Sequence, residues 1–245
     1  MNTISFLKDL TALPLSQLAL ISLGLNLLLC LASIVFYLVV HKIASNQKLL
    51  APYQIWRGSD IFQVGITVLC NAFVLVLGVY LWKYQIVQIN FNASWGTVLW
   101  QVIVLVLVMD FLMYVFHRLA HMPIIYSFIH RKHHDHTHVN ALSLFVLSPF
   151  EAIGFGLFLI VVLGCFSFSY QAIMLYLLIN LLWGTIGHFN IELFPAFAKS
   201  MVGQLIGTAR FHNTHHQMPQ ANYGFYTTLW DKIAGTFSST PKGGE

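Results

Sequence analysis

Residues 110–134 read DFLMYVFHRLAHMPIIYSFIHRKHH, an apolar stretch that ends in a dense run of histidines. Asp110, Tyr114, His117 and His121 recur at spacings of four, three and four residues, which places them on one face of a helix. This helix begins near residue 95, so it is long enough to cross the roughly 30 Å hydrocarbon core of a bilayer. The stretch therefore predicts a membrane-spanning helix that leads directly into a histidine-rich segment.

The composition of the 245-residue chain is that of a membrane protein. Hydrophobic residues make up 58% of it and charged residues only 8%, whereas soluble domains carry about 25% charged residues. Segments 16–40, 60–82 and 95–116 are long enough to span a bilayer, and the apolar stretches 149–166 and 170–187 are short for spans. Residues 149–187 therefore form either two crossings or a half-depth hairpin.

Basic residues predict the orientation in the membrane. If all five apolar stretches cross, ten of the twelve Lys and Arg lie on one side. The positive-inside rule then places the histidine-rich segments and the carboxyl terminus in the cytosol, at a bacterial inner membrane or the endoplasmic reticulum. The net charge of +4 is explained by the basic residues that set this orientation in the membrane. We therefore expect no nucleic-acid partner. The ten are Lys42, Lys48, Arg57, Arg118, Arg131, Lys132, Lys199, Arg210, Lys232 and Lys242, against Lys8 and Lys83.

These features predict an all-α, polytopic membrane helical bundle of about four or five membrane helices with a cytosolic histidine-rich helical cap. Residues 1–95 are expected to form N-terminal membrane helices, and residues 96–240 a second domain of membrane helices and cap, which the family resemblance described below implies is the catalytic domain. The sequence SPFE, residues 148–151, predicts a helix start, with Ser148 as N-cap and Glu151 completing a capping box. Three cysteines lie in separate apolar stretches and are expected to pack in the core: Cys30, Cys70 and Cys165.

Eleven of the twelve histidines follow residue 116, and eight of them fall into three groups with helical spacing. Each group could direct its imidazoles to a single point, as metal ligands do. Eight ligands are too many for one zinc ion, so two metals with about four imidazoles each fit better. Nitrogen-rich sites with open positions suit iron that binds O2, although copper and zinc also accept imidazole. The groups are His117 and His121; His130, His133 and His134; and His212, His215 and His216.

Several other residues are expected near these ligands. His188 falls where the last apolar stretch reaches the histidine side, and could add one ligand. Asp110, Tyr114 and Glu151 are expected to support the ligands, and Asp110 to accept the free N–H of a histidine from the second or third group. The alternative for Asp110 is a polar contact between helices. His136 and His138 do not share a helical face and are weaker candidates, and His41 is expected at the membrane interface.

The segments DFLMYVFHRLAHMPIIYSFIHRKHH, SPFE, FHNTHH and NYGFYTTLWDKIAGT resemble the fatty acid hydroxylase and sterol desaturase superfamily of integral-membrane di-iron enzymes. The resemblance covers residues 98–237 and includes the family's three histidine boxes, HxxxH, HxxHH and HxxHH, in order. It implies that the three groups above, with His188, bind two iron ions. The stretch HHDHTHVNALSLFVLSPFE is closer to the sterol methyl oxidase branch, although Val139 stands where a proline often follows the threonine.

The resemblance implies a membrane-bound oxidoreductase that uses O2 to hydroxylate or desaturate a C–H bond of a lipid, such as a sterol or a fatty acyl chain. Two electrons must come from a separate donor, a b-type cytochrome or a ferredoxin with its reductase, because no flavin or nicotinamide fingerprint occurs in the sequence. Two alternatives remain: a non-catalytic lipid-binding relative, and a membrane metal transporter or sensor. Transport would favour histidines near the bilayer midplane.

Overall fold

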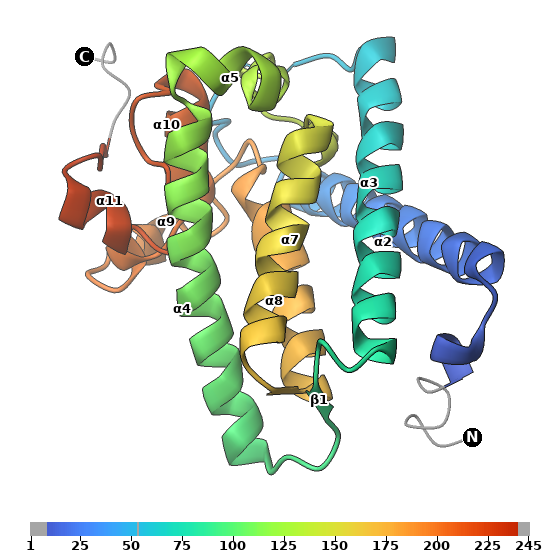
Figure 1. Cartoon of the computed structure of the whole chain (residues 1–245). Helices are drawn as coiled ribbons and strands as arrows, with labels where there is room; N and C mark the ends of the chain where they lie inside the picture. The colour runs from blue at the N-terminus through green and yellow to red at the C-terminus, as the bar shows by residue number, and fades with distance from the viewer. Residues whose placement is uncertain (1–8, 53, 240–245) are drawn as a thin grey trace.

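The computed structural model describes residues 9–52 and 54–239, and it is almost entirely helical (Figure 1). Four helices in this part of the chain are long and apolar enough to cross a membrane: α2 (Leu15–Ile43), α3 (Gly58–Lys83), α4 (Trp95–Ala120) and α8 (Tyr170–Gly187). A fifth apolar helix, α7 (Pro149–Cys165), is shorter. The predicted helical bundle of membrane type is confirmed.

Short helices and turns complete the chain. Helices α5 and α10 lie at the carboxyl end of α4, whereas α11 lies beside α4 (Figure 1). The N-cap residue of α10 is Thr208, whose hydroxyl accepts a hydrogen bond from the backbone N–H of Phe211. The short elements are α5 (Pro123–Ile129), α6 (Arg131–His134), η1 (Ser143–Phe145), α9 (Pro195–Ala198), η2 (Gly203–Leu205), α10 (Ala209–Gln217) and α11 (Leu229–Ala234).

The described residues also contain a very small sheet, which the all-α prediction did not include. Strands β1 (Ile89–Asn90) and β2 (Phe168–Ser169) pair in parallel. The first lies in the connection from α3 to α4, and the second in the turn from α7 to α8. The α7–α8 hairpin therefore reaches the level of the α3–α4 connection, at the end of the bundle opposite α5 and α10 (Figure 1).

Close helix contacts hold the bundle together. The core between α4, α7 and α8 contains Leu105, Met109, Ala172 and Tyr176, each at most 2% exposed. In a bilayer, such packing and hydrogen bonds between helices drive association, because lipid tails are as apolar as the side chains. One such bond joins α2 to α8, with the buried hydroxyls of Ser33 and Thr185 2.7 Å apart.

Helix α7 approaches α3 closely at Gly156. A Cβ atom there would lie 2.5 Å from a methyl carbon of Val74, so any larger residue would push the two helices apart. The N-terminal helices thus contact the helices of the second half of the chain. The division into residues 1–95 and 96–240 stays a prediction.

Candidate metal centre

Nine buried or half-buried histidines gather at the carboxyl end of α4. They form two groups, within each of which one ligand atom per residue lies within 4.8 Å of all the others. Helix α4 and the segment after it supply the first box, α6 with its N-cap residue the second, the end of α8 the additional histidine, and α10 the third box. Site A is His117, His121, His130, His134 and His215, and site B is His133, His188, His212 and His216.

The second and third boxes are divided between the two sites, so the expectation that each box aims at one point is wrong for them. Successive residues on a helix point about 100° apart. His133 and His134 therefore diverge, and His134 joins His130 in site A while His133 enters site B. The third box behaves in the same way, with His215 in site A and its neighbour His216 in site B. The sites are adjacent: the rings of His134 and His216 are 5.0 Å apart.

Backbone carbonyl groups fix the orientation of several imidazoles. Nδ1 of His117 lies 2.8 Å from the carbonyl oxygen of Tyr223, and Nδ1 of His215 lies 2.7 Å from that of Ala221. In site B, Nδ1 of His188 lies 2.7 Å from the carbonyl of Gly184. A carbonyl oxygen can only accept, so each of these Nδ1 atoms carries the proton and donates it. Their Nε2 atoms therefore present lone pairs to the interior of each site.

These lone pairs converge in a way that suits a cation. Nδ1 of His133 faces the carbonyl of Val146 at 3.3 Å, and its Nε2 lies 3.4 Å from Nε2 of His188. Two unprotonated nitrogens repel each other at this distance unless a positive ion lies between them. The Nε2 atoms of all nine imidazoles face one another in this way, and such a group is a donor set for iron, copper or zinc. The residues present therefore fit two metal ions.

Burial keeps the imidazoles available for a metal. Desolvation, and then the nearby His188, hold the pKa of His133 well below its usual range. Desolvation likewise lowers the pKa of His134 to about 3, with a smaller contribution from His117. These side chains are therefore neutral at pH 7, the protonation state in which imidazole binds metals.

Glu151 contacts the site directly. Its Oε1 lies 2.7 Å from Nδ1 of His130, and both side chains are 2% exposed. The predicted helix start is also observed, because the hydroxyl of Ser148 accepts from the backbone N–H of Glu151. The carboxylate that was expected to complete a capping box instead faces His130, the arrangement of an acidic group that orients a metal ligand.

Asp110 and Tyr114 have partners other than those expected. Asp110 accepts hydrogen bonds from the backbone N–H of Tyr226 at 2.8 Å and from the hydroxyl of Thr227 at 2.5 Å. The hydroxyl of Tyr114 lies 3.2 Å from that of Thr236. The prediction of a histidine partner for Asp110 is therefore wrong, and both residues anchor the C-terminal segment to α4. Since Tyr223 of that segment holds His117, Asp110 acts on site A indirectly.

The remaining histidines lie outside the two groups. Nδ1 of His136 is 2.8 Å from the hydroxyl of Ser143, and its Nε2 is 3.3 Å from a carboxylate oxygen of Asp60. This buried contact ties the loop after the second box to α3, and no pattern in the sequence indicated it. The ring of His41 stacks on that of Tyr37 with centroids 4.2 Å apart. His138 is half-buried.

Replacing Asp110 by Asn is expected to loosen the C-terminal segment while the protein still inserts into membranes. The asparagine amide carries no negative charge, and its NH2 group would face one of the groups that donate hydrogen bonds to Asp110. This change should lower the free energy of unfolding by about 2 kcal/mol. Metal retention should fall with it, through Tyr223 and His117. Thermal unfolding in detergent and metal analysis test this, with the exposed Asp9→Asn as control. Unchanged stability in Asp110→Asn would contradict the anchoring role.

Comparison with known proteins places this site in a family. The sequence model of the family described as fatty acid hydroxylase matches residues 102–236. Protein CER1-like 2 of Arabidopsis thaliana is 35% identical over 135 residues, which are 52% of this chain and 22% of that protein. The cholesterol 25-hydroxylase-like protein of Danio rerio is 31% identical over 140 residues, 57% of this chain and 56% of the relative.

A second relative from Danio rerio, cholesterol 25-hydroxylase-like protein 2, is 25% identical over 225 residues, 86% of this chain and 80% of the relative. The chain thus spans 22% and 56% of the length of the first two relatives. No solved structure matches it. The family match covers more than half of the chain and contains every histidine of sites A and B. The chain belongs to the fatty acid hydroxylase family.

Proposed function

We propose that this protein is a membrane-bound di-iron oxygenase that hydroxylates or desaturates a C–H bond of a lipid. The observation that carries the proposal is the pair of adjacent, nitrogen-only sites whose lone pairs converge at one end of an apolar helical bundle. Two iron ions bound there would supply the activation of O2 for oxidation of an unactivated C–H bond. Family membership supports the same chemistry.

The side chains have separate tasks in this proposal. The nine histidines hold the metals, backbone carbonyls orient their rings, and Glu151 fixes His130. The burial of both sites excludes bulk water, which protects a reactive centre from side reactions. A lipid such as a sterol or a fatty acyl chain fits because the sites lie where α4 and α8 end, next to their apolar surfaces. The names of two relatives, cholesterol 25-hydroxylase-like, favour a sterol.

Hydroxylation places one oxygen atom of O2 in the product and reduces the other to water, which takes two electrons and two protons from outside the substrate. The proposal therefore includes an electron-donor protein, a b-type cytochrome or a ferredoxin with its reductase. It also includes the cytosolic orientation of the histidine end that the basic residues predict, since soluble electron carriers would reach the sites from that side.

Metal analysis of the protein purified anaerobically in detergent tests the proposal. We expect close to two irons per chain, and O2-dependent oxidation of a lipid when reductant and donor protein are supplied. Comparing the lipids of cells with and without the gene should identify the substrate by its accumulation. A preparation that holds only zinc and is fully active would overturn the di-iron assignment. Iron-loaded protein that leaves the cellular lipids unchanged would favour a non-catalytic relative.

A further inference from the structure

The chain after the last apolar helix packs against α4. We call residues 194–206 and 229–237 of this part of the chain the C-terminal shelf. Trp230 contacts Phe111 of α4, with ring centroids 4.8 Å apart. The two parts of the shelf are joined by a hydrogen bond from Lys232 to the carbonyl of Gln204, and Thr228, the residue before the second part, donates its backbone N–H to the carbonyl of Leu205. The shelf thus lies alongside a membrane helix at α11, as Figure 1 shows.

The contact with Phe111 sets the depth of the shelf. Helix α4 begins at Trp95, and both Trp95 and Trp100 are exposed, as tryptophans at a membrane interface are. The rise from Trp95 to Phe111 is about 24 Å, which is less than the hydrocarbon thickness of about 30 Å. The shelf therefore lies at the level of the membrane boundary on the side of the metal sites.

The surface of the shelf is apolar where it faces outward. Met201 is 88% exposed, and other large apolar side chains surround it. A patch of this kind in water marks an interaction site, and at this depth the bilayer itself covers it. The exposed large apolar residues of the shelf are Phe194, Phe197, Met201, Val202, Leu205, Leu229, Ile233 and Phe237.

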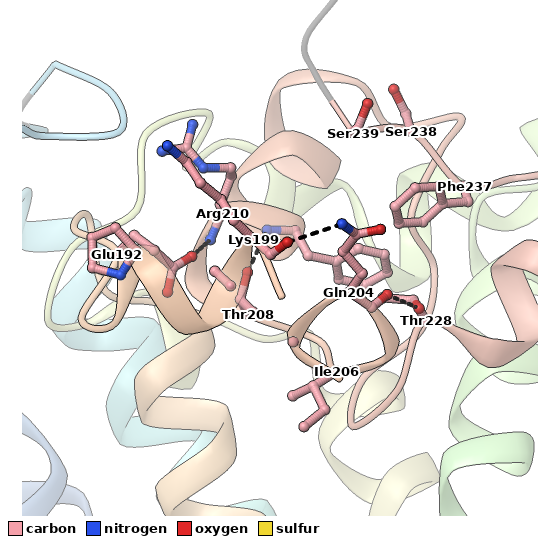
Figure 2. Close-up of a pocket in the computed structure, with 14 residues that line it drawn as sticks. Glu192, Lys199, Gln204, Ile206, Thr208, Arg210, Thr228, Phe237, Ser238 and Ser239 are labelled. Carbon is pink, nitrogen blue, oxygen red and sulfur yellow. Dashed lines mark hydrogen bonds between the residues drawn. The ribbon is translucent and has the colours of Figure 1, made fainter. Parts of the chain in front are cut away.

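A cationic pocket opens beside these apolar residues. Its cavity of about 140 Å³ lies between α9, η2 and α10, and Lys199 and Arg210 line it (Figure 2). A neighbouring hollow, which shares Arg210, adds Lys48. In the described part of the chain, none of these three exposed cations forms a salt bridge with a side chain. Glu192 also lines both spaces, but it is buried and its carboxylate accepts from the backbone N–H of Arg210 at 3.1 Å.

From this arrangement we infer that the C-terminal shelf is embedded in the leaflet next to the metal sites, and that the pocket binds the phosphate headgroup of an anionic phospholipid. The apolar residues contact the acyl chains, while Lys199 and Arg210 neutralise the phosphate above them. The depth of the shelf in the membrane favours a lipid over an acidic protein as the ligand of this pocket. Phe197 and Met201, which flank Lys199 in the sequence, would be buried in the bilayer. The bound lipid would stabilise α10, which carries the third histidine box.

Lipid retention by the full-length protein tests the inference. The protein is reconstituted in nanodiscs of phosphatidylcholine and phosphatidylglycerol, released in mild detergent and examined by native mass spectrometry. Wild type should retain phosphatidylglycerol in preference to phosphatidylcholine. A basic residue at an anionic surface changes affinity about fivefold, so Lys199→Gln should retain about fivefold less and Lys199→Gln/Arg210→Gln about 25-fold less. Phe197→Ser/Met201→Ser should also lower retention, with all cations in place.

Lys83→Gln is the control, because this exposed cation lies at the opposite end of α3. It should retain the lipid as wild type does. Equal retention by Lys199→Gln and wild type would overturn the inference, as would displacement of the lipid by inorganic phosphate alone, which would indicate a soluble-anion site. Lipid retention unchanged in the double variant, with loss of electron-donor binding, would assign the pocket to an acidic protein. Lys199 is exposed, so its single variant is expected to fold.

Discussion

A protein carrying His133→Ala is expected to lose its lipid-oxidising activity and the metal of site B, while site A keeps its own. Changing a residue that merely supports a metal ligand costs about 10- to 100-fold in affinity, so losing one of the four ligands of site B should cost more than about 100-fold. His215→Ala should have the reverse effect on the metals, because His215 belongs to site A. Both variants should insert into membranes normally, because the sites lie at the end of the bundle.

Metal content and site-resolved spectroscopy of the two variants check this expectation, together with turnover of the lipid. His138→Ala is the matched control, because His138 follows the second box closely but belongs to neither site. It should retain both metals and full activity. Wild-type turnover in His133→Ala would remove this residue from the centre. Loss of both metals in each single variant would show that the two sites bind cooperatively and not independently.

Much of the fold is predictable from local patterns. Apolar length predicted segments 16–40, 60–82 and 95–116, which the structure shows as α2, α3 and α4 within a few residues at each end. The SPFE sequence predicted the start of α7 correctly, because an N-cap serine acts through its own neighbours. These features depend on contacts within one helix or on the thickness of a bilayer, so one sequence suffices to find them.

The sequence predicted which histidines gather but not how they are arranged. All nine histidines proposed as ligands gather in the structure. Their division between sites A and B follows from the 100° step between neighbours such as His133 and His134, which the expectation of one shared target for each group did not take into account. The partners of Asp110 could not be predicted, because Tyr226 and Thr227 lie more than a hundred residues away in the chain. Backbone carbonyls that fix ligand rings leave no mark in a sequence.

Glu151 supplies the carboxylate that contacts a ligand of the proposed centre. In this position the carboxylate can accept the Nδ1–H of His130, 2.7 Å away, and turn Nε2 toward His117, whose Nε2 is 2.9 Å from it. All other contacts to the ligand rings reported above come from neutral groups or other histidines. A cation bound in site A would favour the ionised form of Glu151, and the negative charge of this carboxylate would then partly offset the positive charge of the metal.

Glu151→Gln is expected to weaken metal binding in site A by about 10- to 100-fold and to raise the reduction potential of an iron bound there, because the negative charge that stabilises the oxidised ion is lost. The amide keeps the size of the side chain and its ability to accept from His130, so the fold should persist. Ser148→Ala is the control: it weakens the helix start by about 1 kcal/mol but leaves the charge. Metal dissociation rates and redox titration distinguish the effects of the two variants, since a loss of stability alone would not shift the reduction potential of the iron. If Glu151→Gln and Ser148→Ala release metal at the same rate and titrate alike, Glu151 serves only to begin α7.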